Sequence, residues 1–239
     1  MKTYRPIPAA EIEDRLTRFL ESRLGTWPPR ETLTLNPCPL RDEPAWDGSI
    51  RPWVGIESPQ GTVISYSEKV FPEAANLDPV TVEDELMQSD AYMTIPRLFG
   101  RPDMHFGRAV FRYIDQPADF PDAGEWVPRD DPRLPDWLRP FNGDVLVVWD
   151  EDGKYAAGVG LKRHNELGAE IAVGTEPQHR GKGLARMLVA QAARDILAEG
   201  GIPMYLHGDH NAASGRVADA AGFPDRGWHI IEVRFTPPG

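Results

Sequence analysis

The sequence predicts a mixed α/β protein in which a twisted sheet is flanked by helices. The main observation is the order of elements after residue 144, where short runs rich in Val, Ile and aromatic residues alternate with segments of helical periodicity. Such alternation is typical of a layered α/β domain. A second group of helix and strand signals lies before residue 115, which predicts a further α/β region in the first half of the chain.

The first section, residues 1–114, begins with an amphipathic helix. Apolar residues recur at helical spacing from Ile12 to Leu24, and Gly25 ends the pattern. The remaining elements expected here are a strand at 32–35, a hairpin at 53–67 with its turn at 58–61, a helix at 80–98 and a strand at 109–114. The expected inward positions of the helix at 80–98 are Val82, Leu86, Met87 and Met93.

The second section, residues 115–141, is rich in proline and acidic residues and also contains Trp126 and Trp137. Proline-rich acidic stretches are commonly solvated connectors, whereas the two tryptophans favour a lid over a site. Both interpretations stay open from the sequence.

The third section, residues 142–239, contains the sharpest signals. Its expected elements are strands at 144–149, 154–161 and 170–173, a loop at 178–183, a helix from 184, a strand at 203–207, a helix at 212–221 and a strand at 229–235. In the first of these helices Leu184, Leu188, Ala192 and Ile196 form one apolar stripe, and Gly200 and Gly201 end it.

The composition narrows the possible partners. Lys and Arg number 26 against 37 Asp and Glu, a formal net charge of −11, and so acidic a chain lacks the basic surface that duplex nucleic acid requires. Its longest apolar runs, such as 145–149, are far shorter than the roughly 20 residues of a membrane span. The first residues lack an apolar signal core, and the single cysteine, Cys38, favours a reducing compartment. We therefore expect a cytoplasmic monomer or homodimer that binds neither nucleic acid nor membrane.

A glycine-containing loop, Gln178–Gly183, precedes the long helix and reads Q-H-R-G-K-G. Its glycines remove side chains that would hold an anion away from the backbone, while its arginine and lysine add positive charge. Backbone N–H groups at the start of a helix converge on one point, where the helix dipole also favours negative charge. The pattern has neither the Gly-Lys-Ser/Thr ending of a P-loop nor the G-x-G-x-x-G of a dinucleotide-binding fold. It predicts a phosphate site of a different class.

This loop resembles the Q/R-x-x-G-x-G/A signature of the GNAT superfamily, the acyl-CoA-dependent N-acetyltransferases. Ile171–Val173 stands at the position of that family's splayed strand, and Asn211–Ser214 with Ala221–Phe223 is similar to its N-x-A-A/S and G-F segments. The resemblance covers residues 142–235 and implies the GNAT fold for the third section. It also suggests that the first section is an α/β extension, with a degenerate GNAT-like half as one interpretation. Because the sequence has no second signature, one coenzyme site is expected.

The resemblance implies acetyl-CoA as the acyl donor and assigns binding roles. The amides from Arg180 to Ala185 would hold the pyrophosphate, the main chain from Ala172 to Gly174 would bind the pantetheine and the thioester oxygen, and Asn211 would contact the pantetheine arm. The implied coenzyme-binding residues are Ala172, Val173, Gly174, Gln178, Arg180, Gly181, Lys182, Gly183, Leu184, Ala185 and Asn211. No metal is expected, because His207, Asp209 and His210 lack a second cluster with metal-ligand spacing.

Acyl transfer to an amine requires the amine to be neutral when it attacks. Deprotonating a lysine-like amine at pH 7 costs about 4.6 kcal/mol, so a positioned general base helps. His207, at the end of the strand at 203–207, is the first candidate, and Glu170 is the second, as a base or as an anchor for a cationic substrate. His164 and Glu166 are weaker loop candidates. For His207 a hydrogen-bonded structural role is the alternative, and for Glu170 a solvated strand carboxylate.

The chain departs from the GNAT pattern at one catalytic position. Many members carry a tyrosine seven residues after the asparagine, where it protonates the leaving thiolate, and this chain has Ala218 there. Because a thiol has a pKa of about 8.5, its anion is a tolerable leaving group, and Ser214 or water can take the tyrosine's place.

The expected function is N-acetyl transfer from acetyl-CoA to a primary amine by direct attack in a ternary complex. The amine would belong to a small molecule or a protein, and the acidic second section favours a cationic one. The missing tyrosine supports an alternative, a non-catalytic acyl-CoA-binding sensor or regulatory module.

Overall fold

The computed structural model describes residues 7–235, which form two compact units. One unit contains the residues up to Leu16 together with Phe111–Asp225, and we call it the motif unit because it contains the Q-H-R-G-K-G loop. The other, the companion unit, contains Thr17–Val110 and the residues from Arg226 onward. The division falls within helix α1 (Ala9–Leu24) and within strand β4 (Met104–Tyr113).

These units differ from the expected sections 1–114, 115–141 and 142–239. Strand β10 (His229–Phe235) pairs with β4 and with β2 (Trp53–Ser58), so the end of the third section lies in the companion unit. The second section lies in the motif unit, where β5 (Glu125–Val127) pairs with β6 (Val145–Trp149). The physical reason is that strand pairing joins segments far apart in sequence, which no local signal reveals.

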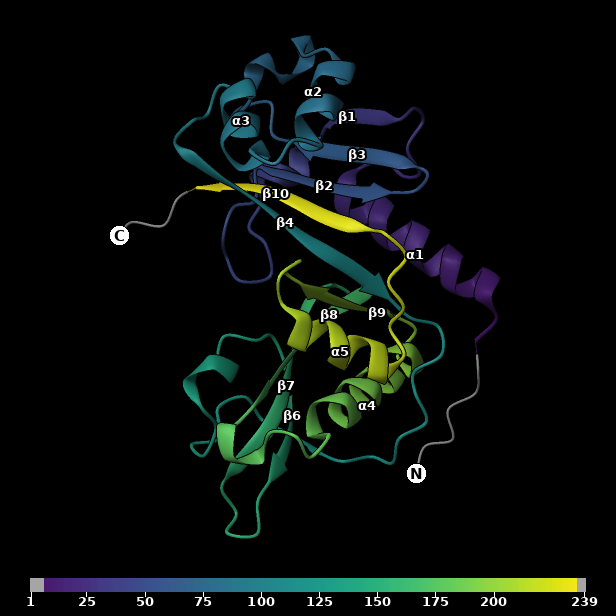
Figure 1. Cartoon of the computed structure of the whole chain (residues 1–239), viewed down its shortest axis with the longest axis vertical. Helices are drawn as coiled ribbons and strands as arrows, with labels where there is room; N and C mark the ends of the chain where they lie inside the picture. The colour runs from purple at the N-terminus through teal and green to yellow at the C-terminus, as the bar shows by residue number, and fades with distance from the viewer. Residues whose placement is uncertain (1–6, 236–239) are drawn as a thin grey trace. The chain divides into compact units, whose positions relative to one another are not determined.

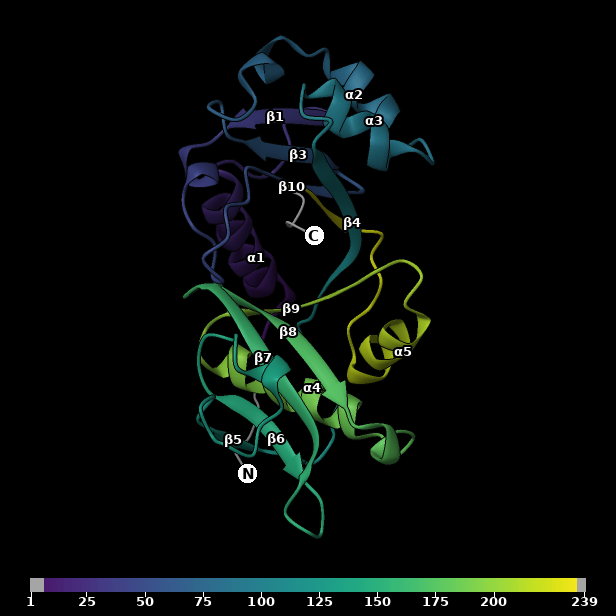
Figure 2. The same cartoon turned by 90° about the vertical axis from the view of Figure 1, so that its left-hand side faces the viewer.

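The motif unit contains a mixed sheet in the order β9-β8-β7-β6-β5. Its other strands are β7 (Tyr155–Asn165), β8 (Gly168–Thr175) and β9 (Ile202–His207). Strands β8 and β9 run parallel, and the other neighbours run antiparallel. Helix α4 (Leu184–Ala198) crosses one face of this sheet (Figure 2), and α5 (Ala212–Ala221) lies beside β9 (Figure 1). This arrangement confirms the predicted mixed α/β fold.

The predicted apolar stripe of α4 forms the core of this unit. Leu188, Ala192 and Ile196 are buried against Val159 of β7 and Ile171 of β8. Full burial of each large aliphatic side chain contributes about 1.5 to 3 kcal/mol, so this face fixes the helix on the sheet. Leu184, the first residue of the stripe, is only partly buried because it lies at the loop end of the helix.

Part of the second section is packed on α4 and is not a solvated connector. Gln191 is buried, and its Oε1 accepts hydrogen bonds from Ala123 N at 2.8 Å and Gly124 N at 3.0 Å. The indole of Trp126 donates to Asp195 Oδ2 at 2.8 Å. A buried amide group that pairs with backbone in this way holds the segment in one register.

The companion unit contains strands in the order β1-β3-β2-β10-β4, with β1 at Leu33–Pro37 and β3 at Gly61–Tyr66. Helices α2 (Pro79–Leu86) and α3 (Ala91–Leu98) lie over β1 and β3 (Figure 1). The remaining short elements are the 3-10 helices η1 (Pro39–Asp42), η2 (Pro72–Asn76), η3 (Asp136–Leu138) and η4 (Pro177–His179).

The predicted helix at 80–98 is wrong, because α2 ends at Leu86 and α3 starts at Ala91. The break shifts the helical phase between the two segments. Met87 and Met93 were expected to face inward, but they are 75% and 42% exposed. Val82 and Leu86 are buried, as the pattern predicts.

Candidate functional site

Two neighbouring strands of the motif unit separate at the centre of the candidate site. The paired register of β8 and β9 runs from Gly168–Ile202 to Ile171–Tyr205. Strand β8 then continues to Thr175, still paired with β7, and β9 continues to His207. We call this divergence the fork. It places the main chain of Ala172–Gly174, the predicted pantetheine site, on the β8 side of the opening.

The glycine loop joins the end of β8 to α4. Gly181 and Gly183 have φ values of 78° and 81°, a left-handed conformation that glycine adopts without strain. Gly183 is the N-cap of α4, and it has no side chain to satisfy the first amides of the helix. Within residues 7–235, the amides from Gly181 to Arg186 have no hydrogen-bond acceptor, whereas Met187 N donates to Gly183 O at 3.3 Å.

This row of amides is well suited to a phosphate group. A Cβ atom built on Gly181 would meet no described atom within 4 Å, so the space over the loop is open. Unpaired amides at a helix N-terminus combine hydrogen-bond donors with the positive end of the dipole. The residues present therefore fit the diphosphate of a coenzyme A molecule.

Side chains at the edge of the loop hold its shape. His179 Nε2 lies 3.5 Å from Asp150 Oδ2 in the turn between β6 and β7, and Lys182 Nζ lies 3.4 Å from His179 Nδ1. Arg180 Nε donates to Thr175 O at 3.3 Å. These contacts join the loop to the end of β8 and to a neighbouring turn. Gln178 lies in η4, where the chain leaves the strand.

The sequence prediction missed Arg186. Its Nε would lie 3.0 Å from a Cβ on Gly183, so the guanidinium group lies beside the N-cap of α4, and its Cζ is 5.1 Å from the centre of the Phe120 ring. A cation in the first turn of a helix opposes the dipole unless an anion is bound nearby. An arginine in the first turn of the predicted helix is therefore a sequence signal that could have indicated Arg186 as a binding residue.

Glu170, the second candidate base, lies in a buried ionic cluster. It is 7% exposed, it forms an ion pair with Lys162 Nζ, and its Oε2 is 3.7 Å from His164 Nε2. Burial by itself would raise the pKa of Glu170, but the contact with His164 and the charge of Lys162 outweigh it and lower the pKa. The alternative of a solvated strand carboxylate is therefore wrong. His164 lies on β7 and not in a loop, and Glu166 is exposed in the turn that follows.

Ser214 and Asn211 lie at the start of α5. Asn211 is the N-cap, and its Oδ1 accepts a hydrogen bond from Ser214 N at 3.0 Å. The Ser214 Oγ is 2.8 Å from the hydroxyl of Tyr205, the last β9 residue paired with β8. Two predicted residues and one missed residue thus meet at the fork. The alternation of side chains along β9 could have indicated that Tyr205 faces inward. It could not have indicated that Ser214 is its hydrogen-bond partner.

His207 lies at the end of β9, next to α5. Its Nδ1 is 3.0 Å from Gly208 O, and its Nε2 is buried with no hydrogen-bond partner among residues 7–235. A Cβ on Gly215 would be 3.5 Å from His207 Cε1, which places the ring against the helix. The ring therefore keeps one buried nitrogen whose hydrogen-bonding capacity no described residue uses.

Aromatic residues of the second section cover the face of β7 and β8 opposite α4. A Cβ on Gly174 would be 2.7 Å from Trp137 Cζ2, and one on Gly160 would be 2.2 Å from Phe141 Cδ2. The Tyr155 hydroxyl donates to Gly174 O at 3.2 Å, and burial raises the pKa of this hydroxyl, so it stays protonated. The glycines on this face therefore provide the space in which the rings pack.

No group of three or more His, Cys, Asp or Glu side chains is placed to hold a metal ion in residues 7–235. The helices of the same range are too short or too polar to cross a bilayer.

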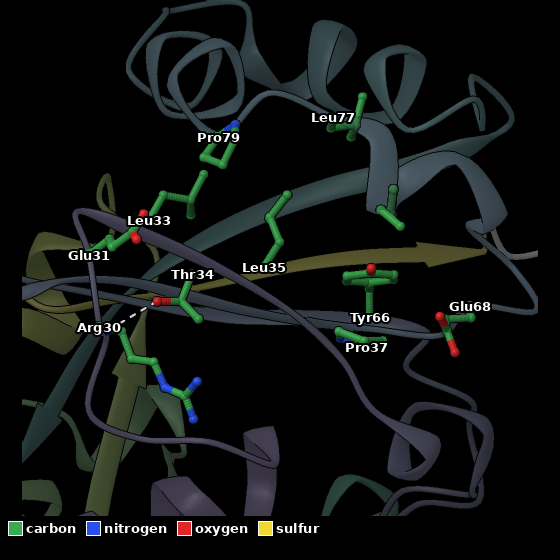
Figure 3. A pocket seen from close by; sticks show the side chains of 12 residues that line it. Arg30, Glu31, Leu33, Thr34, Leu35, Pro37, Tyr66, Glu68, Leu77 and Pro79 are labelled. Carbon is green, nitrogen blue, oxygen red and sulfur yellow. Dashed lines mark hydrogen bonds between the residues drawn. The ribbon is translucent and has the colours of Figure 1, made fainter.

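The companion unit contains a cavity of about 530 Å³ between β1 and the start of α2. Figure 3 shows Leu33 and Leu35 projecting from β1 toward Leu77 and Pro79. Tyr66 also lines this space, and Glu31 and Glu68 contribute charge at its edge. None of the predicted site residues lies in this unit.

Comparison with known proteins identifies the region that contains the fork and the loop. Residues 110–223 match the model of the acetyltransferase (GNAT) family. A mycothiol acetyltransferase of Nocardiopsis dassonvillei is 30% identical over 134 residues, which are 51% of this chain and 39% of that protein. A mycothiol acetyltransferase of Clavibacter sepedonicus is 29% identical over 118 residues, 44% of this chain and 37% of that protein. The chain thus spans about two fifths of the length of the curated relatives it matches.

Among solved structures, the chain is similar to a GNAT-family acetyltransferase described as putative, from Novosphingobium aromaticivorans. It has a TM-score of 0.46 and 23% identity, and the alignment covers 56% of this chain and 67% of that one. The family model runs from the end of β4 through α5 and so includes the open amide row and the diverging strands. Over residues 110–223, this chain is therefore similar to the acetyltransferase (GNAT) family.

Proposed function

We propose that this protein is an N-acetyltransferase that moves an acetyl group from acetyl-CoA to a primary amine by direct attack in a ternary complex. The observation that carries the proposal is the row of unpaired amides from Gly181 to Arg186, at the N-terminus of α4 and next to the fork. The match of residues 110–223 to the acetyltransferase (GNAT) family model supports the same reaction class.

In this proposal the loop amides bind the diphosphate, and Arg180, Lys182 and Arg186 supply positive charge around it. The main chain of Ala172–Gly174 binds the pantetheine arm as an added strand would, because β8 has lost β9 as a partner there. Asn211 directs its amide toward the arm while its Oδ1 caps α5.

On the acceptor side, His207 is the proposed general base, since its Nε2 has no partner among the described residues. Glu170 is better suited to anchoring a cationic amine through the buried cluster, because its lowered pKa makes it a weak base. The Ser214 hydroxyl is the proposed donor to the leaving thiolate. No covalent acyl-enzyme is required, and Cys38 lies in the companion unit.

Release of free thiol from acetyl-CoA tests the proposal. The amine panel contains spermidine, an aminoglycoside, a lysine-rich peptide and an anionic amino acid. It also contains the amine that mycothiol acetyltransferase acetylates, because both curated relatives carry that enzyme's name. Thiol release that depends on one of these amines supports the enzyme. Activity on the anionic amino acid alone would contradict a cationic acceptor.

A non-catalytic acyl-CoA sensor is the second candidate, and Ala218, which replaces the usual tyrosine, is the observation that favours it. Calorimetric binding of coenzyme A with no thiol release across the panel would support the sensor. Failure of coenzyme A to bind at millimolar concentration would exclude both candidates.

A further inference from the structure

A pair of hydroxyl groups lies where β8 and β9 begin to diverge. Tyr205 is 2% exposed and is the last residue of β9 in register with β8. Its hydroxyl is 2.8 Å from Ser214 Oγ, and Ser214 is only partly buried. The pair therefore extends from the buried core of the motif unit to the opening of the fork.

The geometry around α5 limits the choice of a donor for a ligand in the fork. Ala218 is fully buried, so this helix has no room for a large polar side chain at that position. Ser214 lies four residues earlier and thus one turn away on the same face of the helix. Its backbone amide is already held by Asn211 Oδ1, which fixes the serine near the start of α5.

We propose that Tyr205 is a positioning residue for acyl transfer: it donates its hydrogen bond to Ser214 Oγ and so directs the Ser214 O–H toward the sulfur of the bound thioester. This inference rests on the proposed function and adds a residue to it. Burial raises the pKa of the Tyr205 hydroxyl, although Ser214 and Arg112 oppose the shift, so the phenol stays protonated and has a proton to donate. Ser214 then keeps its own proton for the ligand.

In the transfer step, the amine nitrogen forms a bond to the carbonyl carbon while the C–S bond breaks, and the electron pair of that bond stays on sulfur. The Ser214 O–H donates a hydrogen bond to the thiolate. The surplus proton of the amine passes to the base or to water, and the thiolate takes a proton from water when coenzyme A leaves. Neither hydroxyl group needs to lose its proton.

Two measurements test this role, namely steady-state kinetics and the pKa of the enzyme-bound coenzyme A thiol, followed by the ultraviolet absorbance of its thiolate. For Tyr205→Phe we expect kcat to fall roughly threefold to tenfold, as for one lost hydrogen bond, with the KM for acetyl-CoA unchanged and the thiol pKa raised. Ser214→Ala should have the larger effect, the double variant should be no worse than Ser214→Ala, and Ser214→Thr should restore most of the rate. Tyr66→Phe, a buried strand tyrosine of the companion unit, is the matched control.

The outcomes separate this inference from the proposed function. If wild type binds coenzyme A but Tyr205→Phe changes neither kcat nor the thiol pKa, the role of Tyr205 is refuted and the enzyme assignment stands. Additive losses in the double variant would also refute it. If wild type does not bind coenzyme A, both proposals fail. Should Tyr205→Phe not fold, equal rates for Ser214→Ala and wild type would overturn the inference.

Discussion

Trp137 lies directly on Gly174, with the indole Cζ2 2.7 Å from the point where a Cβ of residue 174 would be. The ring thus covers the main chain at which the pantetheine arm is proposed to bind. This contact connects the second section of the sequence to the candidate site, and it favours the lid interpretation of residues around Trp137 over that of an inert connector.

We predict that Gly174→Ala displaces Trp137, because side-chain and backbone shifts that relieve such a clash cost about 1 to 3 kcal/mol. Urea unfolding should show lower stability, and calorimetry should show weaker coenzyme A binding. Gly107→Ala is the control, since a Cβ there makes only an ordinary contact at 3.6 Å with Arg234 Nη2. Equal stability of Gly174→Ala and wild type would contradict the packing described here.

Arg180→Glu places a negative charge at the proposed diphosphate site. The variant should bind coenzyme A at least about tenfold more weakly, since one hydrogen bond to a charged group contributes about 1.5 to 3 kcal/mol. Isothermal titration calorimetry measures the change. Arg97→Glu makes the same charge change on an exposed part of α3 and should bind normally. An unchanged affinity of Arg180→Glu would remove this arginine from the site.

His207→Ala should lower turnover more at neutral than at alkaline pH. At neutral pH a lysine-like amine is largely protonated and needs the base, whereas near pH 10 a large share is already neutral. The measurement is kcat against pH with the best acceptor from the panel. His210→Ala, in the exposed loop three residues later, is the control. A loss of equal size at every pH would identify His207 as structural.

Glu170→Gln should make the free energy of unfolding depend less on pH in the acidic range. Because the folded pKa of Glu170 is lowered, its ion pair stabilises the protein above the unfolded value of about 4.3, and that contribution is lost as the pH falls through the folded pKa. Near pH 7 the variant should be less stable by about 1 to 3 kcal/mol, since Lys162 loses its buried partner.

The difference between Glu170→Gln and wild type should narrow below about pH 4, measured by urea unfolding at a series of pH values. Glu166→Gln changes an exposed carboxylate in the turn between β7 and β8, and its stability should match that of wild type at every pH. A constant difference between Glu170→Gln and wild type across this range would show that ionisation of Glu170 does not stabilise the fold.

Local signals in the sequence predicted much of the motif unit. The stripe from Leu188 to Ile196 lies on the sheet as expected, and the predicted helix at 212–221 has the bounds of α5. Periodicity succeeds here because each element is stabilised by its own apolar face. It failed between Leu86 and Ala91, where no proline or glycine marks the break between α2 and α3.

The conformation of the Q-H-R-G-K-G loop could also be predicted from the sequence, since the positions of its glycines indicate where the backbone turns before the helix. The roles of its predicted neighbours in coenzyme binding stay predictions. The burial of Glu170 could not be predicted from the sequence, because its partner Lys162 lies on the adjacent strand and the strand register determines their contact.

The sequence by itself determined a mixed α/β chain with one glycine loop at a helix start, and the acidic composition of the whole. Only the tertiary structure decided that β10 joins the companion unit, that Trp137 covers Gly174, and that Tyr205 meets Ser214 at the fork. The physical reason is range: helix periodicity and turn chemistry act over a few residues, whereas strand register and side-chain packing bring together groups that are distant in the chain.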